Sequence, residues 1–398
     1  MCLKEASLFV SKGNFVKLAI FTIPLLAAVV GTPAVAGMIE IGAELEKYAS
    51  LSNTYMSGGA NAIVYGSILS KTYADVGDSF SVFGDLRSGG VMTLGASGMA
   101  TGDVQSKIAA TVSAGATVTG SVVAAGGVGT MSAGAGVGGN FAAGGASAFA
   151  IDAVLAGEWQ VGAAELLLDQ LLPEASQLYN ADPTSIYNKA AVAADENFLE
   201  DIKSGIDDNI ASATTELINI KGQLNLLAPT VYLDATMNTD RTFIAGVYSA
   251  PSWSTTAATT LLLDAQFKDD QLWVFNIGDI FAFGGVSTVK MINVNEGDSA
   301  QVIWNTGGYI SIGDGANIVG TMMTDQHIMV GANSTVKSAS DSSCAGLYST
   351  ASFISVGDSA VIGGEGCAVS VPEPGTSSLF LAGLGLIVFV SRRKISKA

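Results

Sequence analysis

The chain has 398 residues, of which 49% are hydrophobic and only 13% are charged, and 48 of them are glycine. A formal net charge of −17 argues against nucleic acid as a partner, because phosphate binding needs clustered Lys and Arg. With 8 prolines and no Gly-X-Y period, collagen is excluded as well. The length allows two or three domains or one long solenoid, and the acidic, Gly-rich composition suits an extracellular β-structure.

The N-terminal end has the features of a secretory signal peptide. Three lysines precede an apolar run over 18–30, and the small residues Ala34-Val35-Ala36 follow it. This order predicts a signal peptide over 1–36. An uncleaved anchor helix is the alternative, but the apolar run is short and the cleavage signal follows directly. Residues 37–56 would then form a lead-in to the mature protein.

A glycine repeat dominates residues 57–148. Each repeated glycine is followed by a small polar residue and then an apolar one, at spacings of 18, 18, 18 and 19: Gly66, Gly84, Gly102, Gly120 and Gly139. A constant period with short apolar runs and Gly turns predicts successive coils of a β-solenoid, with these glycines stacked at one corner. A Gly/Ala linker fits less well, because linkers do not hold an apolar register over five repeats.

Two helical patterns interrupt the β-structure. Residues 163–172 have helical composition and end at Pro173, which predicts a helical insertion over 149–194. A stronger pattern over about 195–227 has Asp195 as a candidate N-cap and one apolar stripe. A single stripe indicates one partner, most simply the flank of the solenoid. The side chains expected to be buried there are Phe198, Ile202, Ile206, Ile210 and Leu217.

The β pattern returns after Pro229. Its segments include Gly246-Val-Tyr248, the run from Val302 to Gly313 and the run from His327 to Val336. In order and spacing, residues 195–336 resemble the ice-binding-like domain family. That resemblance implies a mainly β fold, a right-handed β-helix of triangular section with a long α-helix packed alongside, which we place over 195–370. Two features depart from the family pattern: the 18-residue array stands where the family has capping strands, and Lys337-Ser338 replaces Gly-Arg.

The resemblance implies a flat strand face on which regularly spaced hydroxyl and methyl groups match ordered water. Thr306, Thr321, Thr324 and Thr335 are scattered in the resembling segment. In the array, alternation predicts two outward threonine columns, which are the candidate ice contacts. Ordinary β-propensity of threonine on a solvated face is the alternative. The first column is Thr93, Thr111 and Thr130, and the second is Thr101 and Thr119.

The C-terminal segment 371–398 has three parts. Val371-Pro372-Glu373-Pro374 comes first, an apolar run over 379–390 follows, and Arg392-Arg393-Lys394 comes last. This order resembles the PEP-CTERM sorting signal, which implies recognition by an exosortase, a membrane protease-transpeptidase. The apolar run is shorter than the ~20 residues of a comfortable membrane span, which suits transient anchoring in the cell envelope. A simple single-pass membrane anchor remains the alternative.

Catalytic chemistry is not indicated by any motif. His327 is the only histidine and falls in an apolar strand context, which predicts a packed side chain, and Asp314 suits a solvated corner better than a Ca²⁺ site. We therefore expect no enzyme activity, no metal and no cofactor. Cys344 and Cys367 can form a disulfide in an exported protein or remain as two buried thiols.

Two functions follow from these patterns. The first is an exported, envelope-sorted ice-binding-like protein that binds ice or ordered water through a flat β-helix face. The second is a structural or adhesive surface protein with no ice activity, using the same scaffold in an extracellular polymer matrix. The expected partners are the export machinery, an exosortase-type enzyme, and ice or an extracellular polymer, with the membrane contacted through the tail.

Overall fold

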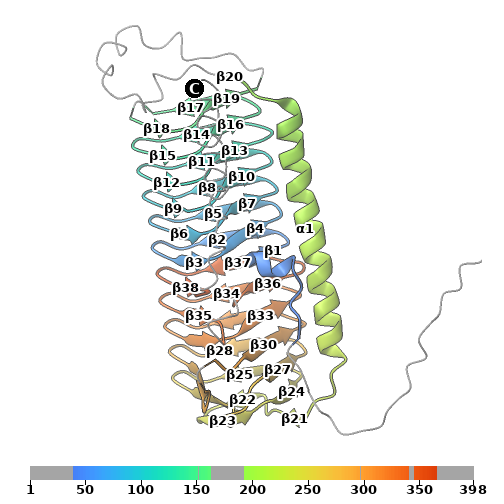
Figure 1. Ribbon diagram of the computed structural model, residues 1–398. Helices are drawn as coiled ribbons and strands as arrows, with labels where there is room; N and C mark the ends of the chain where they lie inside the picture. Colours follow the sequence, from blue (N-terminus) through green and yellow to red (C-terminus); the bar gives the residue numbers. More distant parts are fainter. Residues whose placement is uncertain (1–38, 151, 163–191, 296, 340–344, 365–398) are drawn as a thin grey trace, which may run out of the picture. The chain divides into compact units, whose positions relative to one another are not determined.

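The protein winds into a β-helix of three parallel sheets with one long helix, α1 (Glu196–Asn225), along its side (Figure 1). The computed structural model describes residues 39–150, 152–162, 192–295, 297–339 and 345–364. Each coil gives one strand to each sheet, and a short 3-10 turn, η1 (Leu45–Lys47), precedes the first coil. The predicted mainly β fold with a helix packed alongside is confirmed.

The strands of each sheet follow one another in stack order. Sheet I comprises β20 (Val192–Ala193), β19 (Trp159–Val161), β16 (Phe141–Ala143), β13 (Val122–Ala124), β10 (Val104–Ser106), β7 (Leu86–Ser88), β4 (Ser67–Ser70), β1 (Tyr48–Ser52), β36 (Leu347–Ser349), β33 (Thr321–Thr324), β30 (Ala300–Thr306), β27 (Gln271–Ile277), β24 (Gly246–Ala250) and β21 (Val231–Tyr232).

Sheet II comprises β17 (Ser147–Phe149), β14 (Gly129–Met131), β11 (Ala109–Val112), β8 (Val91–Leu94), β5 (Tyr73–Val76), β2 (Tyr55–Gly58), β37 (Ile354–Val356), β34 (Ile328–Val330), β31 (Ile310–Ile312), β28 (Phe281–Phe283), β25 (Trp253–Thr255) and β22 (Thr236–Met237). Sheet III comprises β18 (Val154–Leu155), β15 (Gly136–Val137), β12 (Thr117–Val118), β9 (Met99–Ala100), β6 (Ser81–Phe83), β3 (Ile63–Tyr65), β38 (Val361–Ile362), β35 (Thr335–Lys337), β32 (Asn317–Val319), β29 (Thr288–Ile292), β26 (Thr260–Asp264) and β23 (Arg241–Ile244).

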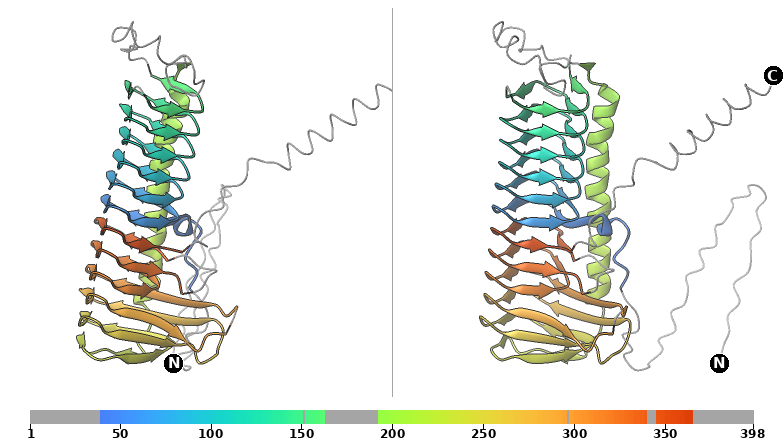
Figure 2. Two further views of the ribbon diagram at one scale, coloured as in Figure 1. Left: turned by 90° about the vertical axis from the view of Figure 1, so that its left-hand side faces the viewer. Right: turned by 60° about the vertical axis from the view of Figure 1, so that its left-hand side comes forward.

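The chain enters this stack in the middle rather than at an end. The first coil (β1, β2, β3) pairs in parallel with the last coil (β36, β37, β38). From the first coil the chain winds to one end of the stack, passes along the side as α1, and winds back from the opposite end (Figure 2). The two solenoid segments are therefore one continuous stack.

The glycines of the 18-residue repeat stack at one corner, as predicted. Gly102 donates its N–H to Gly84 O (2.9 Å), Gly120 to Gly102 O (3.2 Å), and Gly139 to Gly120 O (2.9 Å). A Cβ at Gly84 would lie 2.6 Å from the carbonyl carbon of Gly66. No side chain fits between backbones this close, which explains why the repeat keeps glycine here.

The coils extend further in both directions than the sequence predicted. β1 lies within the expected lead-in 37–56, and β18 and β19 lie within the expected helical insertion 149–194. The predicted start and end of the array were therefore wrong. A coil forms where its strands pair with the neighbouring coil, and the spacing of the glycines does not show where that pairing begins or ends. Residues 163–172, where a helix was expected, lie outside the described residues.

The helix α1 covers the outer face of sheet I. Asp195 caps its first turn by accepting the N–H of Asn197 (2.9 Å), as predicted. Ile206, Ile210 and Leu217 are buried against apolar side chains of the sheet, while Ile202 is half-buried. Phe198 was wrongly expected to be buried.

Phe198 is 40% exposed, and the neighbouring Leu199 is buried instead, against Val123. One residue along a helix is a turn of about 100°, so the position of the sheet decides which of the two is covered.

Candidate functional site

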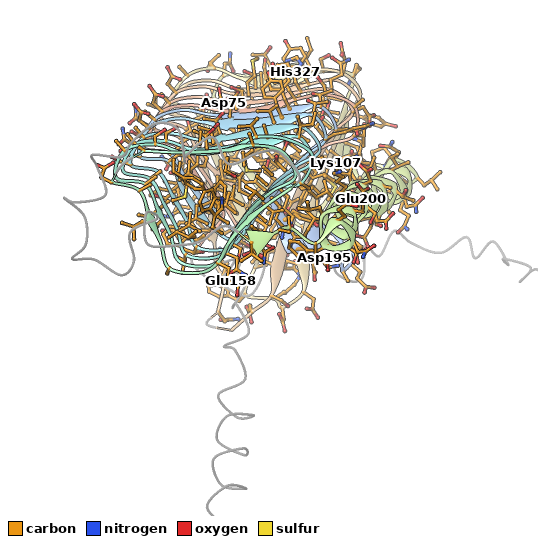
Figure 3. All side chains as sticks on the ribbon, turned by 90° about the horizontal axis from the view of Figure 1, so that it is seen from above. Asp75, Lys107, Glu158, Asp195, Glu200 and His327 are labelled. Carbon is orange, nitrogen blue, oxygen red and sulfur yellow. The ribbon has the colours of Figure 1, made fainter. Side chains whose placement is uncertain are left out.

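The outer face of sheet II lies away from the helix. Seen down the stack, Asp75 and His327 lie on one face, and Asp195 and Glu200 of the helical segment lie on another side (Figure 3). Side chains in this sheet alternate between core and solvent, as in β8, where Met92 and Leu94 are buried and Thr93 is partly exposed. The face is therefore built from every second residue of each strand.

The predicted threonine column is present on this face. Thr111 pairs with Thr93 on one side and with Thr130 on the other, and all three side chains are partly exposed. The column continues beyond the array in both directions and crosses the junction between the first and last coils, where Ser57 pairs with Ser355. The outer column of sheet II consists of Thr236, Ser254, Ala282, Ser311, Met329, Ser355, Ser57, Asp75, Thr93, Thr111, Thr130 and Ala148.

The C-terminal part of this column was missed because its spacing is irregular. Ser254 and Ala282 are 28 residues apart, and Ala282 and Ser311 are 29 apart, although each pair is adjacent in register. Extra loop residues lengthen these coils at the corners without moving the strands out of register. A search for a fixed period does not find such a column.

The second predicted column, Thr101 and Thr119, lies at the edge of sheet III. Ala100 pairs with Val118 in this sheet, and Thr101 and Thr119 are the next residues after the two strands. Thr101 is partly exposed and Thr119 is exposed. The column is short, because Phe83 stands in the preceding coil and Gly138 in the following one.

A ladder of stacked rings runs beside the outer column of sheet II. Its ring centroids are 4.8 Å apart for Tyr309 and His327, 4.9 Å for His327 and Phe353, 4.8 Å for Phe353 and Tyr55, and 4.7 Å for Tyr55 and Tyr73. The interplanar angles are 7°, 4°, 6° and 3°. His327 is thus a packed side chain, as predicted.

The ring spacing shows how regular the face is. Successive centroids lie 4.7–4.9 Å apart over five coils, which is the strand spacing expected for parallel coils. Because the ring planes also stay within 3–7° of parallel, each ring lies directly above the next with little sideways shift.

The four threonines singled out in the resembling segment do not lie on this face, since Thr306, Thr321 and Thr324 belong to strands of sheet I and Thr335 belongs to sheet III. Thr306 and Thr324 are paired in adjacent strands and fully buried. They begin an inner column of hydroxyl groups at the corner between sheets I and II, in which Ser70, for example, donates to Tyr73 O (2.9 Å) and ties the corner. The other members are Ser349, Ser52, Ser88 and Ser106. The sequence does contain a signal for this inner column, because four of its serines, Ser52, Ser70, Ser88 and Ser106, are each 18 residues apart.

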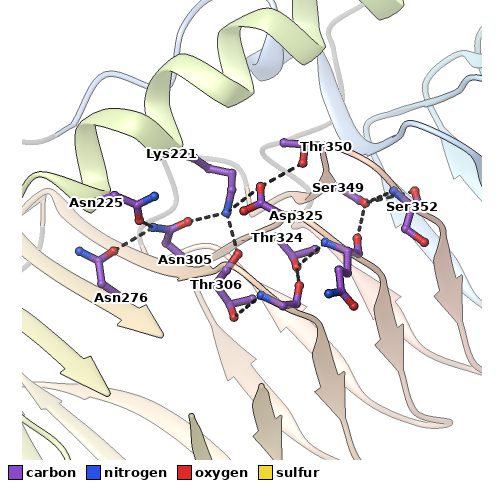
Figure 4. Close-up of polar contacts among 12 residues, drawn as sticks. Lys221, Asn225, Asn276, Asn305, Thr306, Thr324, Asp325, Ser349, Thr350 and Ser352 are labelled. Carbon is purple, nitrogen blue, oxygen red and sulfur yellow. Dashed lines mark hydrogen bonds and ion pairs between the residues drawn. The ribbon is translucent and has the colours of Figure 1, made fainter. Parts of the chain in front are cut away.

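A polar cluster fastens the C-terminal half of α1 to sheet I (Figure 4). The Nζ atom of Lys221 donates to Asn305 Oδ1 and to Thr306 O, both at 2.7 Å, and lies 3.5 Å from the Asp325 carboxylate. Burial lowers the pKa of Lys221 to about 8, although Asp325 opposes this shift. Asn276 Nδ2 donates to Leu224 O at the helix end (2.7 Å). Each of these groups has a structural partner, so the cluster holds the helix rather than a ligand.

Other chemistry is limited within the part of the chain that the structure describes. No group of three or more His, Cys, Asp or Glu side chains there could hold a metal ion. No described helix is long and apolar enough to cross a membrane. The predicted signal peptide, the pair Cys344 and Cys367, and the sorting residues Val371 to Pro374, Arg392 and Arg393 lie outside the described residues.

Comparison with known proteins bears directly on the resemblance found in the sequence. Residues 171–362 match the ice-binding-like family. The ice-binding-like match is wider than the segment 195–336 that carried the resemblance, and it leaves the array 57–148 outside. Residues 370–394 match the PEP-CTERM protein-sorting motif. Both family resemblances are therefore confirmed.

Several solved ice-binding proteins are similar to this chain at low identity. One from the Antarctic ascomycete Antarctomyces psychrotrophicus is 13% identical, with 82% of this chain and 97% of that chain covered and a TM-score of 0.40. Another from an Arctic yeast is 13% identical, with coverage of 84% and 95% and a TM-score of 0.39. A domain from Shewanella frigidimarina is 14% identical, with coverage of 81% and 96% and a TM-score of 0.39. No curated protein matches the sequence.

Proposed function

We propose that this protein is exported, sorted to the cell envelope and binds ice or ordered water through the outer face of sheet II. The observation that carries the proposal is the outer column of hydroxyl and methyl side chains beside a regularly spaced ring ladder. The match of residues 171–362 to the ice-binding-like family supports it, and the sorting-motif match supports export.

A rigid face is what ordered water requires. Thr93, Thr111 and Thr130 sit on strands whose register is fixed by backbone hydrogen bonds before any ligand arrives. Little conformational entropy is lost on binding when the contact groups are ordered beforehand. Small side chains with a hydroxyl and a methyl group can both anchor water and keep the face level.

The test is ice-crystal shaping and thermal hysteresis of the purified protein, with a charged residue placed in the outer column. Thr111→Lys puts a long charged chain into the middle of the face and leaves the inward neighbour Val112 in place. We expect hysteresis to fall at least tenfold while the thermal unfolding midpoint stays unchanged. Thr117→Lys is the matched control, since Thr117 is an exposed threonine in sheet III.

Each outcome has a distinct meaning. Equal loss in both variants would mean that added charge, rather than the face, matters. Full activity in Thr111→Lys with loss in Ser311→Lys would move the ice contact to the family-matched half of the same column. A wild-type protein without ice activity would contradict the proposal and favour the structural or adhesive alternative.

Sorting is tested separately by intact mass of protein extracted from the cell surface. We expect a mature chain that begins near Gly37 and lacks the segment after Val371-Pro372-Glu373-Pro374, as exosortase processing would leave it. A recovered tail that still contains Arg392 and Arg393 would indicate a simple anchor instead.

A further inference from the structure

The ring ladder of sheet II stops at Tyr73. One face of the Tyr73 ring is covered by Tyr55, at a centroid distance of 4.7 Å. The residue paired with Tyr73 in the next coil is Val91, and no described ring covers the second face. Tyr73 is consequently 41% exposed. The ladder thus ends in an aromatic face turned toward an unfilled position.

The unfilled position is a shallow, open depression of about 380 Å³. Tyr73 bounds it on one side, and Val91 is part of its lining. Ile108, which is 53% exposed, bounds it from the coil beyond. Two coil spacings, about 9–10 Å, separate Tyr73 from the level of Ile108. The level between them carries Gly90 and Val91, which are both much smaller than a ring. The volume lies at the lower end of the range for ligand pockets.

The polar side of the depression is formed by Asp75 and Thr93. Asp75 is the only acidic residue in the outer column, where its neighbours are Ser57 and Thr93. Its side chain is exposed, and it makes no hydrogen bond or ion pair with any residue that the structure describes. A free carboxylate next to a free aromatic face is a break in an otherwise regular surface.

We propose that this depression binds one pyranose ring of an extracellular polysaccharide. The C–H groups of a sugar ring carry small positive charges that suit the negative face of Tyr73. Ile108 and Val91 would cover the apolar edge and the opposite side of the ring. The Asp75 carboxylate accepts hydrogen bonds from two neighbouring sugar hydroxyls, and the Thr93 hydroxyl can donate or accept one more.

The shape and chemistry of the lining favour a sugar over a cation. A cation would interact with Tyr73 and Asp75 but would gain nothing from Val91 and Ile108. A flat aromatic ligand would stack on Tyr73 but would leave the Asp75 carboxylate without a donor. A pyranose ring uses both the apolar walls and the carboxylate. The site overlaps one part of the proposed ice-contact face, because Asp75 and Thr93 belong to both surfaces.

The test is calorimetric titration of the full-length protein with cellohexaose, chitohexaose, xylohexaose and mannohexaose. We expect at least one of these probes to bind, with saturation-transfer NMR showing the strongest transfer to ring C–H protons. Tyr73→Leu and Asp75→Asn should each weaken that binding at least tenfold. Tyr309→Leu is the matched control, because it removes the ring at the other end of the same ladder, where Ser311 replaces the carboxylate.

The outcomes separate this proposal from the ice-binding one. Thr130→Lys, three coils from Asp75, should reduce ice activity and leave saccharide binding unchanged. Failure of all four probes at 10 mM overturns the proposal, as does equal weakening by Tyr309→Leu. Tetramethylammonium binding that depends on Asp75, without saccharide binding, would overturn it in favour of a cation site. Thermal unfolding midpoints within about 2 °C of the wild type verify that each variant is folded.

Discussion

The two halves of the β-helix fill their interiors differently. The coils of the array pack mostly small side chains, such as Val82, Ala100 and Val118 at successive levels of one sheet, although Phe80 and Phe141 are also buried there. The coils of the C-terminal half enclose large aromatic rings, with Phe275 and Trp304 stacked at 4.1 Å. Further members of this aromatic cluster are Trp253, Phe281 and Phe283.

The length of the coil explains this difference. Array strands such as β10 have three residues, whereas β27 and β30 have seven each, so the coils that contain them have a wider section. Interiors must be close-packed, so a wider section needs larger side chains. The outer column of sheet II nevertheless crosses both halves in one register. Strand pairing, rather than coil length, determines the outer surface.

The largest expected effect tests the contrast between the two cores. Trp304→Ala removes a fully buried ring whose Nε1 donates to Val319 O (2.8 Å), and should cost about 3–5 kcal/mol in the free energy of unfolding. Val112→Ala, in the narrow array, should cost about 1–2 kcal/mol, because fewer methyl groups are lost. Urea unfolding measures both. Similar costs for the two variants would mean that the cores do not differ in this way.

A change of intermediate size is expected in the pH dependence of stability, and it concerns helix α1. The helix is held to the sheet by different contacts at its two ends. On the array, Lys107 pairs with Asp207 at an exposed site, whereas Lys221 is buried against the C-terminal half. The pKa of Lys221 is lowered to about 8 in the folded state, against an ordinary value of 10.5, mainly by desolvation. Between these values the unfolded state binds more protons, so this group makes stability rise with pH.

Lys221→Met should remove that rise. We expect the difference in unfolding free energy between wild type and variant to change by about 2–3 kcal/mol between pH 7.5 and 10, measured by urea unfolding. Above pH 10 the raised pKa values of Tyr48 and Tyr248 work in the opposite direction, which sets the upper limit of the test. Parallel curves for the two proteins would show that Lys221 keeps its ordinary pKa.

The smallest effect compares a glycine of the array corner with one of the helix. Gly102→Ala would place a Cβ 2.8 Å from backbone atoms of Gly84, and should destabilise the protein by about 1–3 kcal/mol. Gly205→Ala meets no atom within 4 Å and lies inside α1, where alanine is favoured by about 0.5–1 kcal/mol. Thermal unfolding of both variants checks the opposite signs. If Gly102→Ala stabilised the protein, the close backbone contact at the corner could not be the reason why the repeat keeps glycine.

Local pattern was sufficient for a large part of this protein. The spacing of Gly84, Gly102 and Gly120 predicted the coils and their corner, and alternation predicted the outward column of Thr93 and Thr111. The helix over 196–225 followed from its apolar stripe and the cap at Asp195. Each of these features is set by interactions within a coil, between consecutive coils, or within one helix.

What the sequence could not determine depends on contacts between distant segments. The pairing of Ser57 with Ser355 joins residues 298 apart, and parallel strands offer the same backbone hydrogen bonds to many partners. The choice of Leu199 over Phe198 depends on where sheet I lies beside the helix. The uncovered face of Tyr73 exists only because β5 is followed by a strand that presents Val91. The sequence determined the coil, and the tertiary structure determined which coils meet and which side chains share a face, because register is fixed only when the strands pair.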